Sequence, residues 1–180
     1  WLKNIYEFGC GTGHNLLRVK KFNKNARLHG LDWVKSSQKI IKKLGFEAHN
    51  FDFFNPSCLK LKENSGVLTV AALEQTGKNY KKFVSYLIKN NPSVVIHIEP
   101  IEELLDPKNL LDYLSLKYFK KRKYLSGYLT YLRKLEKCGK IKILKAKRTG
   151  IGSLFIEGYS VIVWTTYENS KKQGTLSGVQ

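Results

Sequence analysis

Gly9, Gly11 and Gly13 alternate with other residues near the start of the chain, between an apolar stretch that predicts a strand over residues 4–8 and a helix expected over residues 15–21. Glycine is required where the backbone turns sharply or lies directly against a ligand, because it has no side chain in the way. The first N–H groups of the following helix would point at such a ligand. The stretch therefore predicts a binding turn at the carboxyl end of a first strand.

Segments typical of strands and helices alternate along the first hundred residues. The strands are expected over residues 4–8, 27–32, 46–51, 66–73 and 93–98, and the helices over residues 15–21, 36–44 and 80–89. Continuous apolar strands fit a parallel sheet buried on both faces, and helices between such strands make right-handed crossovers. The sequence therefore predicts an α/β fold with a doubly wound, mostly parallel sheet.

The pattern changes after Pro100, where two successive helices are expected over residues 104–118 and 124–137. A basic run at residues 120–123 lies between them in this prediction. The segment is longer than one crossover needs and is rich in tyrosine. We interpret residues 101–137 as a helical insertion that forms a lid or pocket wall, with packing of the helices onto the sheet as the alternative.

Two further strands are expected over residues 140–147 and 155–166, joined by a glycine-containing loop at 149–152. So short a loop is typical of a hairpin, which makes the last strand antiparallel to the rest and brings the total to seven strands. We expect one domain over residues 1–167. The polar tail at 168–180 is expected to be frayed.

The formal net charge is +18, which is compatible with an anionic partner such as nucleic acid. Only five of the 32 basic residues are arginine, however, and a surface that grips phosphate favours arginine forks. A nucleic-acid partner is therefore possible but not favoured. Attraction to an anionic small substrate or to a membrane surface remains open, although no apolar run is long enough to span a membrane.

The three cysteines, Cys10, Cys58 and Cys138, are an odd number without metal-ligand spacing. They favour free thiols and a cytoplasmic location. The sequence begins at Trp1 and contains no methionine, so we interpret it as a fragment. Helices before the first strand are expected to be missing from it.

Glu7 precedes the first glycine by two positions and sharpens the choice of ligand. A dinucleotide turn requires glycine where this chain has His14, and a carboxylate at Glu7 would repel a pyrophosphate but could hold an ammonium group. The stretch Glu-Phe-Gly-Cys-Gly-Thr-Gly resembles the opening signature of class I S-adenosylmethionine-dependent methyltransferases. The resemblance extends over residues 3–167 and implies a Rossmann-like fold with a terminal antiparallel strand. It also implies S-adenosylmethionine as cofactor and S-adenosylhomocysteine as product.

The resemblance assigns cofactor contacts along the chain. Asp32, at the end of the second strand, would hold the ribose hydroxyls, and Trp33 beside it could pack on the adenine. Asp52 would accept a hydrogen bond from the adenine amino group, and the apolar Phe53 would lie beside it. The predicted cofactor-binding residues are Glu7, Gly9, Cys10, Gly11, Gly13, Asp32, Trp33, Asp52, Phe53, Ala72 and Leu73. The alternatives are that Glu7 caps a strand end, that Asp32 caps the next helix, and that Asp52 makes an Asx turn.

Absent motifs restrict the methyl acceptor. The Asn/Asp/Ser-Pro-Pro-aromatic tetrad of enzymes that methylate exocyclic amino groups is absent after the fourth strand, where residues 72–75 read Ala-Leu-Glu-Gln. The Pro-Cys nucleophile of cytosine-carbon enzymes and an acidic metal cluster are also absent, so no metal is expected. We expect a small-molecule acceptor, such as a sugar or another polar or anionic metabolite. A nucleic-acid methyltransferase and a catalytically silent binding domain are the alternatives.

His97 and Glu99 share one face at the end of the fifth strand, and Pro100 ends that strand. Either could act as a base or orient the acceptor, so both are predicted to be catalytic. The alternatives are a core histidine and a structural carboxylate. Glu74, Tyr124 and Tyr128 are predicted to contact the substrate.

Overall fold

The computed structural model describes residues 2–56, 59–153 and 156–170. Its strands are β1 (Asn4–Phe8), β2 (Arg27–Asp32), β3 (Glu47–Asn50), β4 (Ser65–Val70), β5 (Val94–Glu99), β6 (Ile141–Ser153) and β7 (Ile156–Thr166). Its α-helices are α1 (His14–Phe22), α2 (Lys35–Lys43), α3 (Lys81–Asn90), α4 (Leu110–Arg122) and α5 (Tyr128–Lys137), and two short 3-10 helices are η1 (Leu73–Thr76) and η2 (Glu102–Leu104). Most of the predicted tail, from residue 171 onward, lies outside the described residues.

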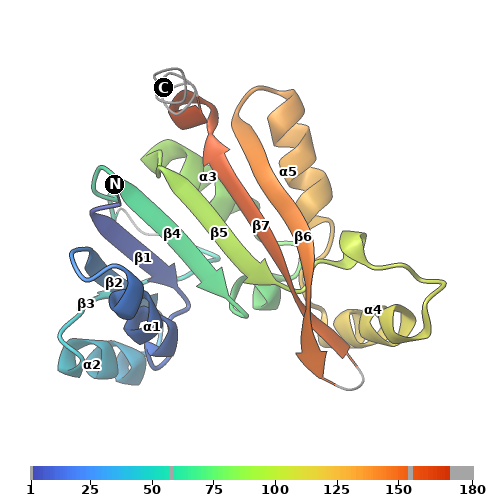
Figure 1. The fold of residues 1–180 in the computed structure, drawn as a ribbon, viewed down its shortest axis with the longest axis horizontal. Helices are drawn as coiled ribbons and strands as arrows, with labels where there is room; N and C mark the ends of the chain where they lie inside the picture. The colour runs from blue at the N-terminus through green and yellow to red at the C-terminus, as the bar shows by residue number, and fades with distance from the viewer. Residues whose placement is uncertain (1, 57–58, 154–155, 171–180) are drawn as a thin grey trace.

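The strands form one seven-stranded sheet in the order β3-β2-β1-β4-β5-β7-β6 (Figure 1). Neighbouring strands from β3 to β5 pair in parallel, while β7 pairs antiparallel with both β5 and β6. The order runs outward from β1 in both directions, so the crevice at the carboxyl ends of β1 and β4 is the place where such sheets bind ligands. The predicted doubly wound α/β fold with its antiparallel last strand is confirmed.

Helices cover both faces of the sheet. On one face, α3 and α5 bury the larger apolar cluster, which includes Phe8, Phe83, Leu132 and Trp164. On the other face, α1 and α2 bury a smaller cluster over β1 and β2. Helix α4 lies beside the distal part of the β6–β7 hairpin, at the opposite end of the sheet from α1 and α2 (Figure 1).

Two predicted boundaries are wrong, for reasons of tertiary structure. The fourth strand ends at Val70 rather than residue 73, because Ala71 takes a left-handed φ of 50° and η1 follows. The predicted hairpin loop at 149–152 is instead part of β6, which continues to Ser153 with register shifts between Arg148 and Gly152. Pairing with β7 thus overrides the turn preference of the two glycines, which the strand accommodates as an irregularity.

The helical segment also differs from its prediction at both helix starts. Helix α4 begins at Leu110, where the Asn109 side chain accepts hydrogen bonds from two backbone N–H groups as an N-cap. It then runs through Arg122, so most of the basic run belongs to the helix, and Lys123 ends it in a left-handed conformation. Helix α5 begins at Tyr128, after Gly127. Among the described residues, no helix is long and apolar enough to cross a membrane.

Candidate cofactor and acceptor site

The glycine turn joins β1 to α1 at the carboxyl edge of the sheet. All three glycines have positive φ, at 71° for Gly9, 50° for Gly11 and 77° for Gly13, which a residue with a side chain adopts only at a cost. A Cβ on Gly9 would lie 2.3 Å from the Cβ of Ala72, whereas a Cβ on Gly11 would find nothing within 4 Å. The first glycine thus allows the β1 and β4 loops to approach each other, and the second borders open space.

Asp32 ties the end of β2 to this turn. Its Oδ2 accepts a hydrogen bond from the Gly11 N–H at 3.0 Å, and its Oδ1 accepts one from the Val34 N–H at 2.9 Å. The residue is only 9% exposed, yet it lines the pocket that the turn opens onto. Each carboxylate oxygen can accept a second hydrogen bond, so Asp32 keeps acceptor capacity for a ligand hydroxyl.

Glu7 lies behind the turn at the end of β1, and it is 1% exposed. Its Oε1 accepts a hydrogen bond from Asn15 Nδ2 at 2.7 Å, while Oε2 has no partner among the described residues. Burial raises the pKa of Glu7 to about 7, because the surroundings do not solvate its charge. A buried oxygen without a partner is costly unless a ligand completes it.

A cavity of about 420 Å³ lies at the carboxyl ends of β1, β2 and β4. Its lining residues are Gly9, Gly11, Asp32, Trp33, Phe51, Asp52, Phe53, Phe54, Ala71, Ala72, Gln75 and Thr76. Seven of the eleven predicted cofactor residues are therefore brought together around one cavity. The sequence prediction missed Asn15, which follows the motif on the first turn of α1, and the aromatic residues Phe51 and Phe54.

Individual positions refine these assignments. Trp33 is 74% exposed and lies on the rim of the cavity. Asp52 accepts the Phe54 N–H at 2.8 Å, so it does form the Asx turn that was its alternative, while still lining the cavity.

Four of the predicted cofactor residues do not line the cavity. Glu7 and Cys10 are buried beside the turn, and burial raises the pKa of the Cys10 thiol to about 12. Leu73 is in the core, and Gly13 faces α2, where an added Cβ would lie 2.6 Å from Ile41.

Glu99 is fully buried at the end of β5. Its Oε1 accepts hydrogen bonds from the backbone N–H groups of Ala72 at 3.2 Å and Leu73 at 3.1 Å. Its Oε2 accepts a hydrogen bond from the Glu74 N–H at 3.1 Å. Burial raises its pKa to about 7, even though these hydrogen bonds favour the charged form. Since three backbone groups of the β4 loop and η1 use the carboxylate, and it lines none of the described cavities, its geometry matches the structural alternative.

His97 is also fully buried, one pleat before Glu99. Its Nδ1 lies 2.9 Å from the Thr69 hydroxyl, and its ring packs edge-on against Tyr128 at a centroid distance of 5.4 Å. Burial lowers its pKa to about 3, so the ring is neutral. His97 is therefore placed in the core beneath the sheet edge, away from the described cavities, as its own alternative stated.

The three predicted substrate residues divide into two groups. Glu74 and Tyr124 line the same cavity of about 360 Å³ between η1, α4 and the β6–β7 hairpin. Burial raises the pKa of Glu74, and the Tyr124 hydroxyl partly offsets this. Tyr128 is instead 0% exposed and packs on Tyr80 in the core, so the structure does not bring it to the other two.

Comparison with known proteins identifies the fold. No protein-family model matches the sequence, and no curated protein matches it. Solved structures of methyltransferases do match: the methyltransferase domain of bacterial CtHen1-C has a TM-score of 0.64 at 16% identity, with 91% of this chain and 89% of that chain covered. At this identity the likeness concerns the fold, and the chain has the class I methyltransferase fold.

Larger enzymes match over part of their length. The O-methyltransferase NcsB1 from neocarzinostatin biosynthesis, in complex with S-adenosylmethionine and 2-hydroxy-5-methyl naphthoic acid, has a TM-score of 0.62 at 15% identity. Human N-acetylserotonin methyltransferase, in complex with S-adenosylmethionine, also has a TM-score of 0.62, at 16% identity. The matches cover 92% and 91% of this chain, but this chain spans only 49% and 47% of those enzymes.

Proposed function

We propose that the protein is a methyltransferase that transfers a methyl group from S-adenosylmethionine to a small-molecule acceptor. The observation that carries the proposal is the pairing of Asp32 with the open glycine turn, behind which a buried Glu7 oxygen has no partner in the part of the chain that the structure describes. The fold likeness to methyltransferases crystallised with S-adenosylmethionine supports the same conclusion.

The residues that line the cavity, together with Glu7 buried behind its glycine turn, fit this cofactor by their chemistry. Glu7 would receive its ammonium group, and the remaining lone pairs of Asp32 would accept the two ribose hydroxyls. Phe53 and Trp33 offer aromatic faces to the adenine ring. When bound, S-adenosylmethionine supplies an electrophilic methyl group on a sulfonium.

The chain's own groups would then orient and deprotonate the acceptor. We propose that Glu74, whose pKa is raised by burial, accepts the proton that the acceptor loses, with Tyr124 positioning it. Glu99 is a positioning residue in this scheme, because its carboxylate holds the backbone of η1, which carries Glu74. In this scheme the helical segment 101–137 would form a wall of the acceptor site, which is the role that we expected for it from the sequence.

The kind of acceptor is inferred from the cavities, and the place of action from the cysteines. A small polar or anionic molecule suits the size of the cavities beside η1, about 680 and 360 Å³, better than a nucleic acid does. The two described cysteines, Cys10 and Cys138, are free thiols, which agrees with action in the cytoplasm.

Calorimetry with S-adenosylhomocysteine tests the proposal. The parent chain should bind the ligand, and Asp32→Ala should bind it about ten- to a hundredfold more weakly, since a charge-assisted hydrogen bond contributes about 1.5–3 kcal/mol. Asp106→Ala is the matched control, because Asp106 is exposed before α4 and should leave the affinity unchanged. No binding by the folded parent chain at millimolar ligand, or equal affinity in Asp32→Ala, would overturn the proposal.

A further inference from the structure

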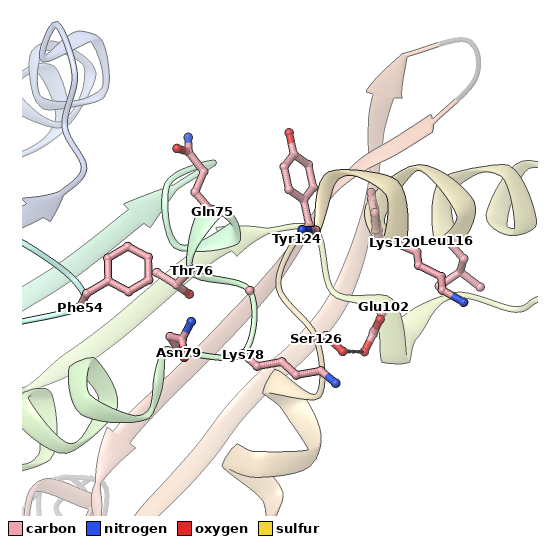
Figure 2. A pocket seen from close by; sticks show the side chains of 13 residues that line it. Phe54, Gln75, Thr76, Lys78, Asn79, Glu102, Leu116, Lys120, Tyr124 and Ser126 are labelled. Atoms are coloured by element: carbon pink, nitrogen blue, oxygen red, sulfur yellow. Dashed lines mark hydrogen bonds between the residues drawn. The ribbon is translucent and has the colours of Figure 1, made fainter.

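A second and larger cavity, of about 680 Å³, lies beside the cofactor cavity (Figure 2). Its walls come from the loop after β4 on one side and from the end of α4 and the α4–α5 connection on the other. The lining residues are Phe54, Gln75, Thr76, Gly77, Lys78, Asn79, Glu102, Leu116, Phe119, Lys120, Lys123, Tyr124 and Ser126. Nothing in the cofactor scheme uses its far wall on α4.

The cavity borders the sites on both sides of it. It shares Phe54, Gln75 and Thr76 with the cofactor cavity. It shares Phe119 and Tyr124 with the smaller cavity that contains Glu74. A molecule held here would therefore extend from the cofactor cavity toward the proposed proton acceptor.

The charge of this cavity is positive. Lys78, Lys120 and Lys123 contribute three ammonium groups, and Glu102 is the one carboxylate in the lining. One oxygen of Glu102 is used within the protein, because its Oε1 accepts hydrogen bonds from the Ser126 hydroxyl at 2.7 Å and the Gly127 N–H at 2.9 Å. Within the described parts of the chain there is one ion pair, between Arg148 and Asp112. None of the three lysines therefore forms an ion pair with a carboxylate there.

The same cavity has an apolar side. Phe54 is half exposed toward it, and Leu116 and Phe119 of α4 add aliphatic and aromatic surface. Figure 2 shows Phe54 and Lys120 on opposite sides of the hollow, with Tyr124 between them. A ligand with an apolar or aromatic body and an anionic group would therefore satisfy both kinds of wall.

Two loops that carry the lysines are fixed against each other. The Ser126 N–H donates to the Gly77 carbonyl at 3.3 Å, and a Cβ on Gly77 would lie 3.0 Å from the Lys123 carbonyl oxygen. The Lys123 N–H in turn donates to the Lys120 carbonyl at 3.1 Å at the end of α4. Close backbone contact thus places the backbones of Lys78 and Lys123 at one end of the cavity, so both side chains start from that end.

We propose that this lysine cavity binds the methyl acceptor and that the acceptor carries a phosphate ester or carboxylate on an apolar or aromatic body. The assignment as acceptor site rests on the proposed function, whereas the anion selectivity stands on the cavity itself. Lys120 and Lys123 bind the anionic group, and Phe54 and Phe119 contact the body. The reacting atom of the acceptor faces the cofactor cavity across Gln75 and Thr76.

The test uses 1-naphthyl phosphate as probe and 1-naphthol as its uncharged counterpart, titrated into the full chain and followed by probe fluorescence. The phosphate should bind at least about tenfold more tightly than the naphthol, the scale of one charge-assisted hydrogen bond. The double variant Lys120→Gln/Lys123→Gln should lose about tenfold in affinity for the phosphate. The matched control, Lys42→Gln/Lys43→Gln in the last turn of α2, should stay within about twofold.

Separate titrations distinguish this proposal from the proposed function. Both double variants should bind S-adenosylhomocysteine like the parent, which also shows that they are folded. Equal affinity for naphthol and naphthyl phosphate, equal weakening in the two double variants, or displacement of the probe by S-adenosylhomocysteine would overturn the lysine cavity as the site. Binding of the probe without any binding of S-adenosylhomocysteine would overturn the proposed function and leave an anion site alone.

Discussion

The ends of β1 and β5 each bury a glutamate at the same edge of the sheet, and the two differ in their partners. Glu7 and Glu99 are 1% and 0% exposed, and burial raises the pKa of each to about 7. Glu99 accepts three backbone N–H groups through both oxygens. Glu7 accepts a hydrogen bond from the Asn15 amide, and the Leu16 backbone N–H also lowers its pKa, while its Oε2 beside the glycine turn has no partner among the described residues.

The two regions therefore share the residue type and its burial near the carboxyl end of a strand, and they differ in the hydrogen-bond donors around the carboxylate. A buried carboxylate whose donors come from its own chain stabilises a loop. A buried carboxylate with an open oxygen beside a cavity is suited to a cationic ligand group. This difference leads us to propose binding for Glu7 and positioning for Glu99.

The largest effect should come from removing the β5 carboxylate. Glu99→Ala leaves three N–H groups without an acceptor, two of them buried and one partly buried, and should lower the free energy of unfolding by roughly 3–5 kcal/mol in urea denaturation. Glu136→Ala is the matched control, because Glu136 accepts a single backbone N–H, that of Ile143, and should cost about 1 kcal/mol.

Equal destabilisation in these two variants would refute the positioning role. A Glu99→Gln variant with parent stability but a turnover lower by about a hundredfold would instead restore the catalytic role predicted from the sequence.

The second effect is a pH-dependent change in the free energy of unfolding, caused by Glu7→Gln. The pKa of Glu7 is about 7 in the folded chain and 4.5 in the unfolded chain, so the folded state holds its proton more tightly. Its stabilising contribution is present below pH 4.5 and is lost as the pH rises to 7. Without the ligand, Glu7→Gln should therefore be more stable than the parent at pH 8, by up to about 3 kcal/mol, with little difference at pH 4.

With the ligand, the same variant should behave in the opposite sense. At pH 8, Glu7→Gln should bind S-adenosylhomocysteine about tenfold more weakly in calorimetry, because the amide carries no charge for the ammonium group. Glu47→Gln, exposed on β3, is the control for both measurements. If Glu7→Gln is more stable than the parent but binds S-adenosylhomocysteine with the same affinity, Glu7 is not part of the site.

The smallest effect on stability should come from the glycine turn at Gly11. Gly11→Ala introduces a left-handed alanine into open space and should cost about 1–2 kcal/mol of unfolding free energy, yet its methyl group should weaken S-adenosylhomocysteine binding. Gly9→Ala is the contrast, because its Cβ would meet Ala72 and should cost distinctly more in thermal unfolding. If the two alanines cost the same, or if Gly11→Ala bound the ligand normally, the space at Gly11 would not belong to the cofactor.

Local sequence predicted the β1–β2 region well. The bounds of β1 and β2 were predicted to the residue, because short apolar runs there end at glycines or at an aspartate that begins a loop. Asp32 meets the glycine turn because adjacent parallel strands bring their carboxyl ends together.

Features that depend on distant residues could not be predicted. The end of β4 is set in part by Glu99, 27 residues away from Ala72. The lysine cavity combines Lys78 with residues of α4 from Leu116 onward, far along the chain, so no local pattern reveals it. The tyrosines Tyr124 and Tyr128 have similar sequence surroundings, and only the start of α5 between them decides that one faces a cavity and the other the core.

The strand order at the far end of the sheet also determines how the chain is built. β7 lies between β5 and β6 in the sheet. β6 is therefore synthesised before β7 but does not pair with β5. Its pairing with β7 is local and begins at Ser153 and Ile156, whereas Val95 of β5 pairs with Trp164 across 69 residues. Loop closure favours the local pairing, so we expect the hairpin to form as a unit and join the growing sheet last. Until the ribosome has released β7, the edge of β5 stays open to pairing with other chains, so we expect β7 to close that edge and leave β6 as the edge strand of the sheet.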